Sequence, residues 1–171
     1  MIRVHSWFWY LGLLAVAVPF VGAEDKKEAG GFEMTKDEQE LLKLLNKERA
    51  KKELPPLRPN PLLFKVARGH SANMARQQKM EHVLDGKNPG QRILAAGYDY
   101  GRATENIAMA DGPGVPLKRV VSDWMESKIH RDNLLDTKIS ETGLGIAKND
   151  KGEVYYTQMF ARPRKVIKKP N

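Results

Sequence analysis

The chain has 171 residues, the length of one globular domain rather than two. Its 29 Lys and Arg residues against 21 Asp and Glu residues give a formal net charge of +8, and 41% of the residues are hydrophobic, enough for a packed core. Because the chain contains no cysteine, disulfide frameworks, thiolate nucleophiles, iron–sulfur clusters and Cys-ligated zinc are all excluded.

The first 23 residues have the pattern of a secretory signal peptide. Arg3 precedes an apolar run that ends in the small residues Gly22 and Ala23, and charged residues follow. Retention as a membrane anchor is the alternative, but Pro19 and the small residues cut the run short of the ~20 apolar residues that a span needs. We therefore expect cleavage after Ala23 and a product that is secreted, periplasmic or held in the cell envelope.

The folded domain is predicted to begin at residue 35. Residues 24–34 are charged and lack apolar periodicity, which indicates a flexible lead-in. Thr35 and Glu38 have the spacing of a capping box, and leucines then recur at helical spacing. This pattern predicts a first helix that runs to Lys51–Lys52.

Three further helical segments follow. Asn60 and Pro61 are a typical helix start and predict a second helix that ends near Lys79. A shorter segment at residues 91–96 stops before a glycine, and residues 117–125 carry apolar side chains along one helical face. Each of these helices is expected to pack against a sheet through its apolar face.

The last part of the domain changes to the period of a strand. Apolar residues alternate at residues 105–110, 144–146 and 154–160. Residues 149–152 have the composition of a turn, so the last two segments predict a hairpin. Helices followed by paired strands indicate an α+β domain at residues 35–161, with a basic C-terminal tail at residues 162–171.

Three histidines lie beyond the predicted leader, and each has a structural as well as a functional interpretation. His70 falls on the apolar face of the second helix, which favours a buried, hydrogen-bonded imidazole. His82 lies after that helix beside turn residues, where it faces either a pocket or ordinary solvent. His130 is expected past the end of the helix that contains Trp124, where a cationic side chain suits the negative end of the helix dipole.

Glu105 is the acidic residue of most interest because it heads a strand of small and apolar residues. A buried carboxylate needs a partner. A histidine would suit, since the carboxylate fixes one ring N–H and leaves the other nitrogen for a metal, a water or a ligand. The same pair can also hold a loop in place without any chemistry.

Several sequence strings together resemble one known family. The strings occupy residues 44–50, 70–75, 105–108, 124–127, 130–135, 143–147 and 155–160. In this order they resemble the bacterial branch of the CAP superfamily (cysteine-rich secretory, antigen 5 and pathogenesis-related proteins), whose module is also called the SCP domain. The resemblance covers residues 41–160 and implies a three-layer α-β-α sandwich with a central antiparallel sheet flanked by helices.

The resemblance also implies a site. Family members gather two His and two Glu in a central cleft, and some are proposed to bind a divalent metal there. His82 occupies the first His position and Glu105 the first Glu position, while His130 looks like the second imidazole in place of the His that many eukaryotic members have at Tyr155. The candidate set for catalysis or for a Zn²⁺ or other divalent ion is thus His82, Glu105 and His130. The expected cleft neighbours are His70, Glu126, Tyr155 and Gln158.

Two functions follow from these residues. The first is a non-catalytic binding module whose His- and Glu-lined cleft takes a small or extended ligand. The alternative is a metal-dependent or His/Glu-assisted hydrolase, protease-like and acting outside the cytoplasm. The chain lacks the His-Glu-x-x-His spacing of metalloproteases, and neither Ser71 nor Ser127 has the setting of a nucleophile. The binding module is therefore favoured.

The expected partner is a small molecule, a lipid or a cell-envelope polymer. Nucleic acid is not expected, because export separates the protein from DNA and no array of alternating basic and aromatic residues is visible. The tail from Arg162 concentrates basic residues, which predicts weak contact with anionic envelope surfaces. A simply solvated tail is the alternative.

Overall fold

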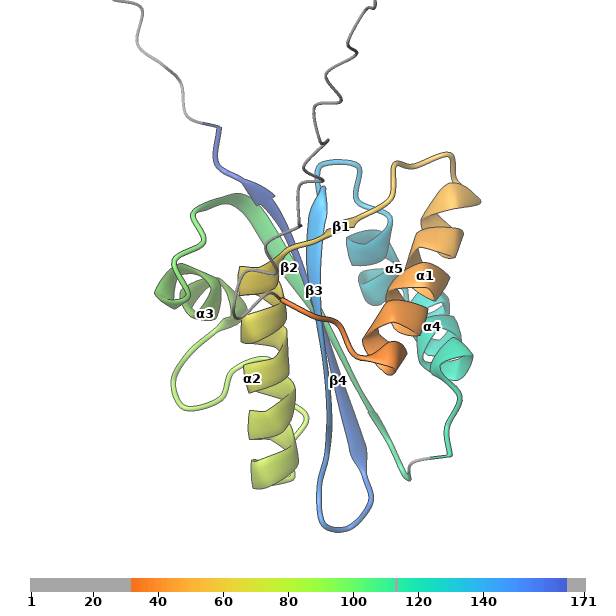
Figure 1. Cartoon of the computed structure of the whole chain (residues 1–171), viewed down its shortest axis with the longest axis vertical. Helices are drawn as coiled ribbons and strands as arrows, with labels where there is room; N and C mark the ends of the chain where they lie inside the picture. The colour runs from red at the N-terminus through yellow and green to blue at the C-terminus, as the bar shows by residue number, and fades with distance from the viewer. Residues whose placement is uncertain (1–31, 113, 166–171) are drawn as a thin grey trace, which may run out of the picture. The chain divides into compact units, whose positions relative to one another are not determined.

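The structure is a computed structural model that describes residues 32–112 and 114–165 (Figure 1). The predicted signal peptide and nearly all of the lead-in lie outside these residues. Within the described part of the chain, no helix combines the length and hydropathy needed to cross a membrane.

The described residues form five helices and four strands. In chain order these are α1 (Lys36–Ala50), β1 (Arg58–Pro59), α2 (Pro61–Gln77), α3 (Pro89–Ala95), β2 (Tyr100–Ala110), α4 (Leu117–Glu126), α5 (Lys128–Leu134), β3 (Glu141–Lys148) and β4 (Val154–Pro163). The predicted helices and the hairpin are all present.

The four strands form one sheet in the order β1-β3-β4-β2. β4 pairs antiparallel with both β2 and β3, whereas β1 pairs parallel with β3, so the sheet is mixed rather than wholly antiparallel. β1 was not predicted because two residues carry no alternation. Figure 1 shows α2 and α3 on one face of the sheet and α1, α4 and α5 on the other, which confirms the three-layer α-β-α architecture.

The helix starts follow the side-chain chemistry of the sequence. Thr35 Oγ1 accepts a hydrogen bond from the Glu38 N–H (3.2 Å), and the Glu38 carboxylate accepts one from the Thr35 N–H (2.8 Å), which completes the capping box of α1. Asn60 caps α2 in a similar way. α2 ends at Gln77, two residues before the predicted Lys79, because Gln78 adopts a left-handed conformation with φ of 53°.

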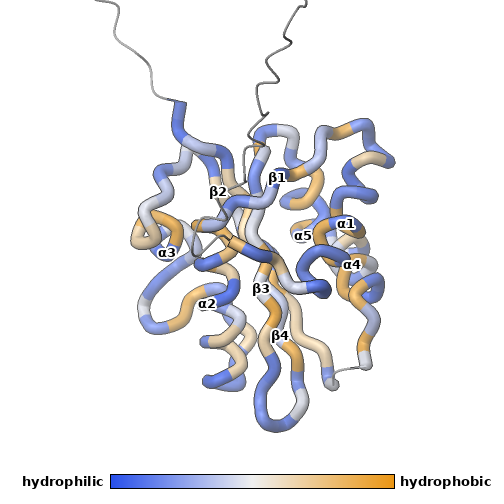
Figure 2. The backbone as a smooth tube through the Cα atoms, in the orientation of Figure 1, coloured by the Kyte–Doolittle hydropathy of each residue, from blue (hydrophilic) through white to orange (hydrophobic). Residues whose placement is uncertain are grey.

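Hydrophobic residues fill both sides of the sheet. The larger cluster lies toward α1 and α4 and includes Leu41, Leu45, Trp124 and Phe160. Smaller clusters lie toward α2 and α3. Figure 2 shows hydrophobic residues along the middle of β3 and β4 and hydrophilic ones at the turn between them. Because helices cover both faces, the first eight residues of β4 are all buried.

α2 packs directly on the backbone of β3 at two glycines. A Cβ added at Gly143 would lie 2.0 Å from the carbonyl carbon of Leu63, and one at Gly145 would lie 2.2 Å from the carbonyl oxygen of Ala67. Residues two apart in a strand share a face, so both glycines lie under α2. Ser71 Oγ adds a hydrogen bond to the Gly145 carbonyl oxygen (2.9 Å). This close approach fixes the height of α2 over the sheet.

The structure adds a helix at His130 that the sequence did not predict. As expected, the residue lies past the end of α4, the helix that contains Trp124, but it belongs to α5, a separate seven-residue helix that begins after Ser127, where ψ of 120° interrupts the helical path. The short α5 shows no clear apolar face in the sequence, and its Ile129 is 74% exposed. The interaction of His130 with the dipole of α4 stays a prediction.

Two strands extend further than the sequence indicates. β2 begins at Tyr100 rather than near residue 105, and β4 continues to Pro163. Arg162 therefore belongs to the sheet rather than to the tail. Arg164 follows the strand and pairs with Asp99 (Nε to Oδ1, 2.9 Å), and residues 166–171 lie outside the described part.

Candidate functional site

Glu105 lies on β2 with its carboxylate almost wholly buried, the side chain being 1% exposed. Its Oε1 accepts a hydrogen bond from His82 Nδ1 (2.8 Å), and its Oε2 accepts one from the Arg92 guanidinium (2.5 Å). A buried carboxylate is stable only when such partners compensate it. The partner that the sequence required for Glu105 is thus supplied by His82 together with Arg92.

Arg92 comes from α3 and ties a loop to the sheet. Besides Glu105, its guanidinium donates to the backbone carbonyl oxygens of His82 (2.9 Å) and Lys87 (2.8 Å). Sequence reasoning missed Arg92, because nothing local links an arginine on a short helix to an acid 13 residues away on a strand. The only signal was that a buried acid needs a counter-charge.

The ring of His82 is held in one orientation. An ionised carboxylate only accepts hydrogen bonds, so Nδ1 carries the proton and Nε2 keeps its lone pair. The side chain of His82 is 49% exposed. The arrangement therefore presents an oriented imidazole nitrogen at the protein surface.

His130 approaches the same region from the opposite helical layer. Asn106 follows Glu105 on β2, and its Nδ2 donates to the backbone carbonyl oxygen of His130 (3.0 Å). Burial, and secondarily repulsion from the His82 ring when it is protonated, lower the pKa of the half-buried His130 below its usual range. We call Glu105, His82, Arg92 and His130 the Glu105 cluster.

Side chains of α4 and α5 contact the middle of the outer edge of β2. Asn133 Nδ2 donates to the Glu105 carbonyl oxygen (3.3 Å), and Trp124 Nε1 donates to the Ile107 carbonyl oxygen (3.1 Å). β2 is the last strand in the sheet order, so these contacts occupy acceptors that no strand uses. They also hold α5, and with it His130, against β2.

His70 lies beneath the cluster and is 1% exposed. Its Nε2 donates to the Glu81 carbonyl oxygen (3.0 Å) and lies 3.9 Å from Glu105 Oε1, which is beyond hydrogen-bond reach. Burial lowers the pKa of His70, although Glu105 opposes the shift. His70 is thus the neutral, buried imidazole that its place on the apolar face of α2 indicates.

The other expected neighbours lie apart from the cluster. Gln158 is fully buried and donates to a threonine of β3 (3.3 Å). Tyr155 is buried too and donates to the carboxylate of Glu153 (3.0 Å), while Glu126 is exposed and accepts from a serine one turn earlier (3.1 Å). In the described residues, none of the three bonds to a side chain of the Glu105 cluster.

The residues present do not form a ready metal site. Both carboxylate oxygens of Glu105 are engaged, and the positive charge of Arg92 beside them opposes a cation. Within residues 32–112 and 114–165, no three His, Cys, Asp or Glu side chains are placed to hold one ion. Zinc at His82, Glu105 and His130 would require Arg92 to leave Glu105, and it stays a prediction.

Acidification is expected to destabilise the fold through His70. Burial lowers the pKa of His70 in the folded protein, whereas the unfolded chain has the ordinary value of 6.5. As the pH falls through 6.5, the unfolded chain takes up this proton first, so the contribution of neutral His70 to stability is lost toward the lower, folded pKa. Urea unfolding of wild type and His70→Gln at pH 7.5 and 5.5 measures this loss.

The His70→Gln variant should lose less stability than wild type between these two pH values. His130→Gln is the control for the second lowered pKa, because its effect has the same sign. Equal losses in wild type and His70→Gln would contradict the assignment of His70 as a neutral buried group.

Comparisons with known proteins identify the family of the fold. The chain matches the model of the cysteine-rich secretory protein family (CAP) over residues 42–160. It is 33% identical over 124 residues to the Bacillus subtilis protein YkwD, covering 72% of this chain and 46% of YkwD. It is 32% identical over 131 residues to the Bacillus subtilis membrane protein YlbC, covering 75% of this chain and 35% of YlbC. The chain thus spans less than half the length of these two curated relatives.

Solved structures show the same fold. An outer surface protein from Borrelia burgdorferi superposes with a TM-score of 0.70 at 24% identity, covering 78% of this chain and 97% of that protein. An extracellular SCP-domain protein from Bacillus anthracis gives a TM-score of 0.62 at 27% identity, covering 77% of this chain and 45% of that protein. With the family match over most of the folded part and the α-β-α layers, we conclude that the chain belongs to the CAP family of cysteine-rich secretory proteins.

Proposed function

We propose that the protein is an exported, non-catalytic binding module in which His82 and His130 form the polar wall of a ligand site. The observation that carries this proposal is the half-exposed ring of His82, which the buried carboxylate of Glu105 holds at 2.8 Å. A fixed ring loses little freedom when its Nε2 accepts a hydrogen bond from a ligand.

Exposed apolar side chains beside the two imidazoles support a ligand with mixed character. Met80 is 49% exposed and Val83 51% exposed, both within two residues of His82, and Ile129 precedes His130 with 74% exposed. Contiguous exposed apolar residues are typical of binding surfaces, and these three residues are the candidates for such a surface. The ligand class is thus one with hydrogen-bonding groups and apolar substituents, drawn from small molecules, lipids or cell-envelope polymers.

Export is supported by the pattern of the first 23 residues and by the location of structural relatives. One relative is named as an outer surface protein and another as an extracellular protein. The Cys-free composition suits a protein that does not depend on oxidative folding.

Retention of envelope fragments by the immobilised protein tests the site. Wild type is expected to retain at least one component of a soluble cell-envelope digest, detected by mass spectrometry. His82→Ala should weaken this retention about tenfold, the equivalent of one hydrogen bond of about 1.4 kcal/mol. Lys43→Ala on α1 is the matched control, since its side chain is 79% exposed and should leave retention unchanged. Equal retention by all three proteins would reject the site.

A hydrolase is the second candidate, because a carboxylate that orients a histidine is also how a general base is held. Casein and chromogenic esters should show no turnover that depends on His82 if the binding module is correct. Zinc titration by calorimetry into wild type, His82→Ala and His130→Ala decides the metal prediction. Stronger binding by wild type than by both variants supports a shared metal, and equal heats reject it.

A further inference from the structure

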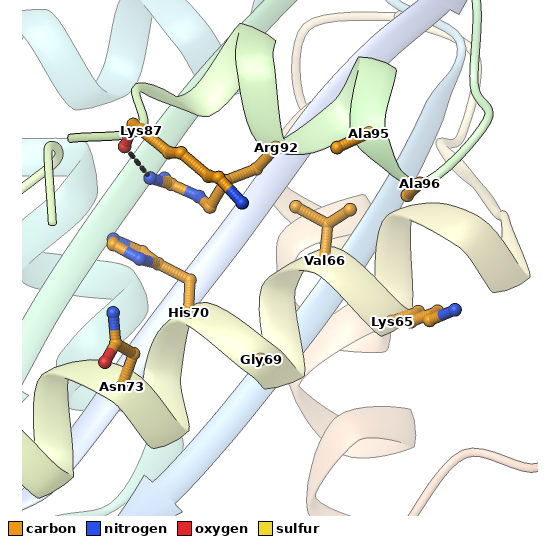
Figure 3. A pocket seen from close by; sticks show the side chains of 9 residues that line it. All are labelled: Lys65, Val66, Gly69, His70, Asn73, Lys87, Arg92, Ala95 and Ala96. Carbon is orange, nitrogen blue, oxygen red and sulfur yellow. Dashed lines mark hydrogen bonds between the residues drawn. The ribbon is translucent and has the colours of Figure 1, made fainter. Parts of the chain in front are cut away.

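A cavity of about 300 Å³ lies between α2 and α3 (Figure 3), at the lower end of the ~300–1,000 Å³ range of small-molecule sites. Val66 of α2 and Ala95–Ala96 at the end of α3 form its apolar part. Arg92 belongs both to this cavity, which we call the α2–α3 pocket, and to the Glu105 cluster. His82 and His130 do not line it, so it is distinct from the ligand wall proposed above.

The charged side chains that line the α2–α3 pocket are all basic, and one acid, Asp85, lies just outside the lining, where it accepts a hydrogen bond from Asn73 (2.9 Å). Lys65, Lys87 and Arg92 line it, and no acidic side chain does. Arg92 is compensated by Glu105, whereas both lysines are exposed and neither forms an ion pair within residues 32–112 and 114–165. Figure 3 shows Lys87 and Arg92 together at one end and Lys65 at the other. An anionic group is therefore favoured at the Lys87–Arg92 end.

Gly69 lies inside α2 on the wall of the pocket, where packing does not require a glycine. A Cβ added there would meet no atom within 4 Å, and its φ is not in the left-handed region. Glycine is less favourable than alanine in a helix interior. The contrast with Gly143, where a Cβ would clash with α2, shows that the fold gains nothing from glycine at position 69. The residue instead keeps this wall of the pocket open.

Two side chains of the pocket carry buried polar atoms without a partner. In the described residues, His70 Nδ1 and Arg92 Nε are buried and form no hydrogen bond. The His70 side chain is wholly buried, and Figure 3 shows its ring rising from α2 toward the side chain of Arg92. Because buried polar groups in folded proteins are nearly always paired, the unpaired Arg92 Nε–H points to a missing acceptor, such as a carboxylate oxygen. His70 Nδ1 is itself an acceptor, because Nε2 carries the proton donated to Glu81, so its missing partner is a donor such as water.

We propose that the α2–α3 pocket binds a small organic carboxylate with a compact apolar body. The carboxylate lies at the Lys87–Arg92 end, where it meets positive charge and hydrogen-bond donors. The apolar body lies over Val66, Gly69 and Ala95–Ala96. The pocket and the His82 wall share Arg92 but are otherwise lined by different residues, and variants of Lys87 and Gly69 test the pocket without touching His82 or His130.

Titration with cyclohexanecarboxylate, followed by ¹H–¹⁵N NMR of the full chain, tests this proposal. We expect saturable shifts in α2 and α3, centred on Gly69. Cyclohexylmethylamine, which has a similar body and the opposite charge, should bind at least tenfold more weakly. Gly69→Leu fills the wall and should abolish the shifts, and Lys87→Glu should weaken binding at least tenfold. Added salt should also weaken binding, because two of the cations are exposed.

Three outcomes would overturn the proposal. These are no saturable shifts at millimolar carboxylate, equal binding of the amine, or wild-type binding by Lys87→Glu. Lys87 is exposed, so that variant keeps the test decisive even if Gly69→Leu fails to fold. Lys43→Ala on α1 serves as the matched control, because Lys43 is exposed and does not line the pocket, so its replacement should leave carboxylate binding unchanged.

Discussion

Gly143→Ala is expected to destabilise the protein by about 3 kcal/mol or more, near the upper end for overpacking. The added Cβ would lie 2.0 Å from the carbonyl carbon of Leu63 and 2.2 Å from the N atom of Phe64. Both atoms belong to the backbone of α2, so no side-chain rotation relieves the contact. The helix must move off β3, and the buried contacts between them are then lost. Urea unfolding followed by circular dichroism measures the effect.

Gly69→Ala is the matched control, since it makes the same chemical change on α2 where nothing lies within 4 Å of the new atom. It is expected to raise the free energy of unfolding by up to about 1 kcal/mol, because alanine has the better helix propensity. The two variants are expected to change the free energy of unfolding in opposite directions. This difference distinguishes a packing clash from a general effect of replacing glycine by alanine. A Gly143→Ala protein as stable as wild type would disprove the direct contact between α2 and β3.

Glu105→Gln is expected to lower the free energy of unfolding by about 3–5 kcal/mol, the usual effect of removing one member of a buried ion pair. The change leaves the positive charge of Arg92 without its counter-ion in a side chain only 12% exposed. It also removes the charged acceptor that fixes the Nδ1–H form of His82. Chemical unfolding measures the loss, and the ¹⁵N shifts of the His82 ring report the tautomer.

Two companion variants separate the buried pair from charge loss in general. Glu105→Gln combined with Arg92→Met should recover a large part of the lost stability, because no unpaired buried charge is left. Asp123→Asn breaks the exposed pair with Arg119, whose two side chains are 48% and 68% exposed, and should cost under about 1 kcal/mol. If Glu105→Gln were no more damaging than Asp123→Asn, the cluster would not be a buried ionic centre.

Local chemistry made much of the fold predictable. Thr35 and Glu38 specify the start of α1 through backbone donors that lie within one turn, and Asn60 does the same for α2. The alternation on either side of a turn predicted the hairpin of β3 and β4. In contrast, α5 depends on contacts of its residues with β2, such as that of Asn133. No pattern within its seven residues predicts these contacts.

The candidate site was predictable only in part. A single acidic residue in an apolar strand indicates a buried negative charge that needs a hydrogen-bonding or cationic partner. The family resemblance identified His82 as such a partner of Glu105. The role of Arg92 depends on where α3 packs against the sheet, and this position cannot be predicted from the local sequence. Tyr155 and Gln158 could not both line one cleft, because residues three apart in a strand point to opposite faces. Both faces of β4 are covered by helices, so each side chain is buried in a different layer.

The two edge strands of the sheet, β1 and β2, affect how readily copies of this protein aggregate at high concentration. On one side, Trp124 and Asn133 occupy backbone acceptors of β2. On the other side, β1 offers only two residues, one of them a proline that has no N–H to donate. In the described part of the chain, these contacts block the middle of the β2 edge and leave only two residues on the β1 edge, which disfavours intermolecular strand addition, the first step of amyloid-like growth. If the protein is exported as proposed above, these two edges protect it from such aggregation where cytoplasmic chaperones cannot act.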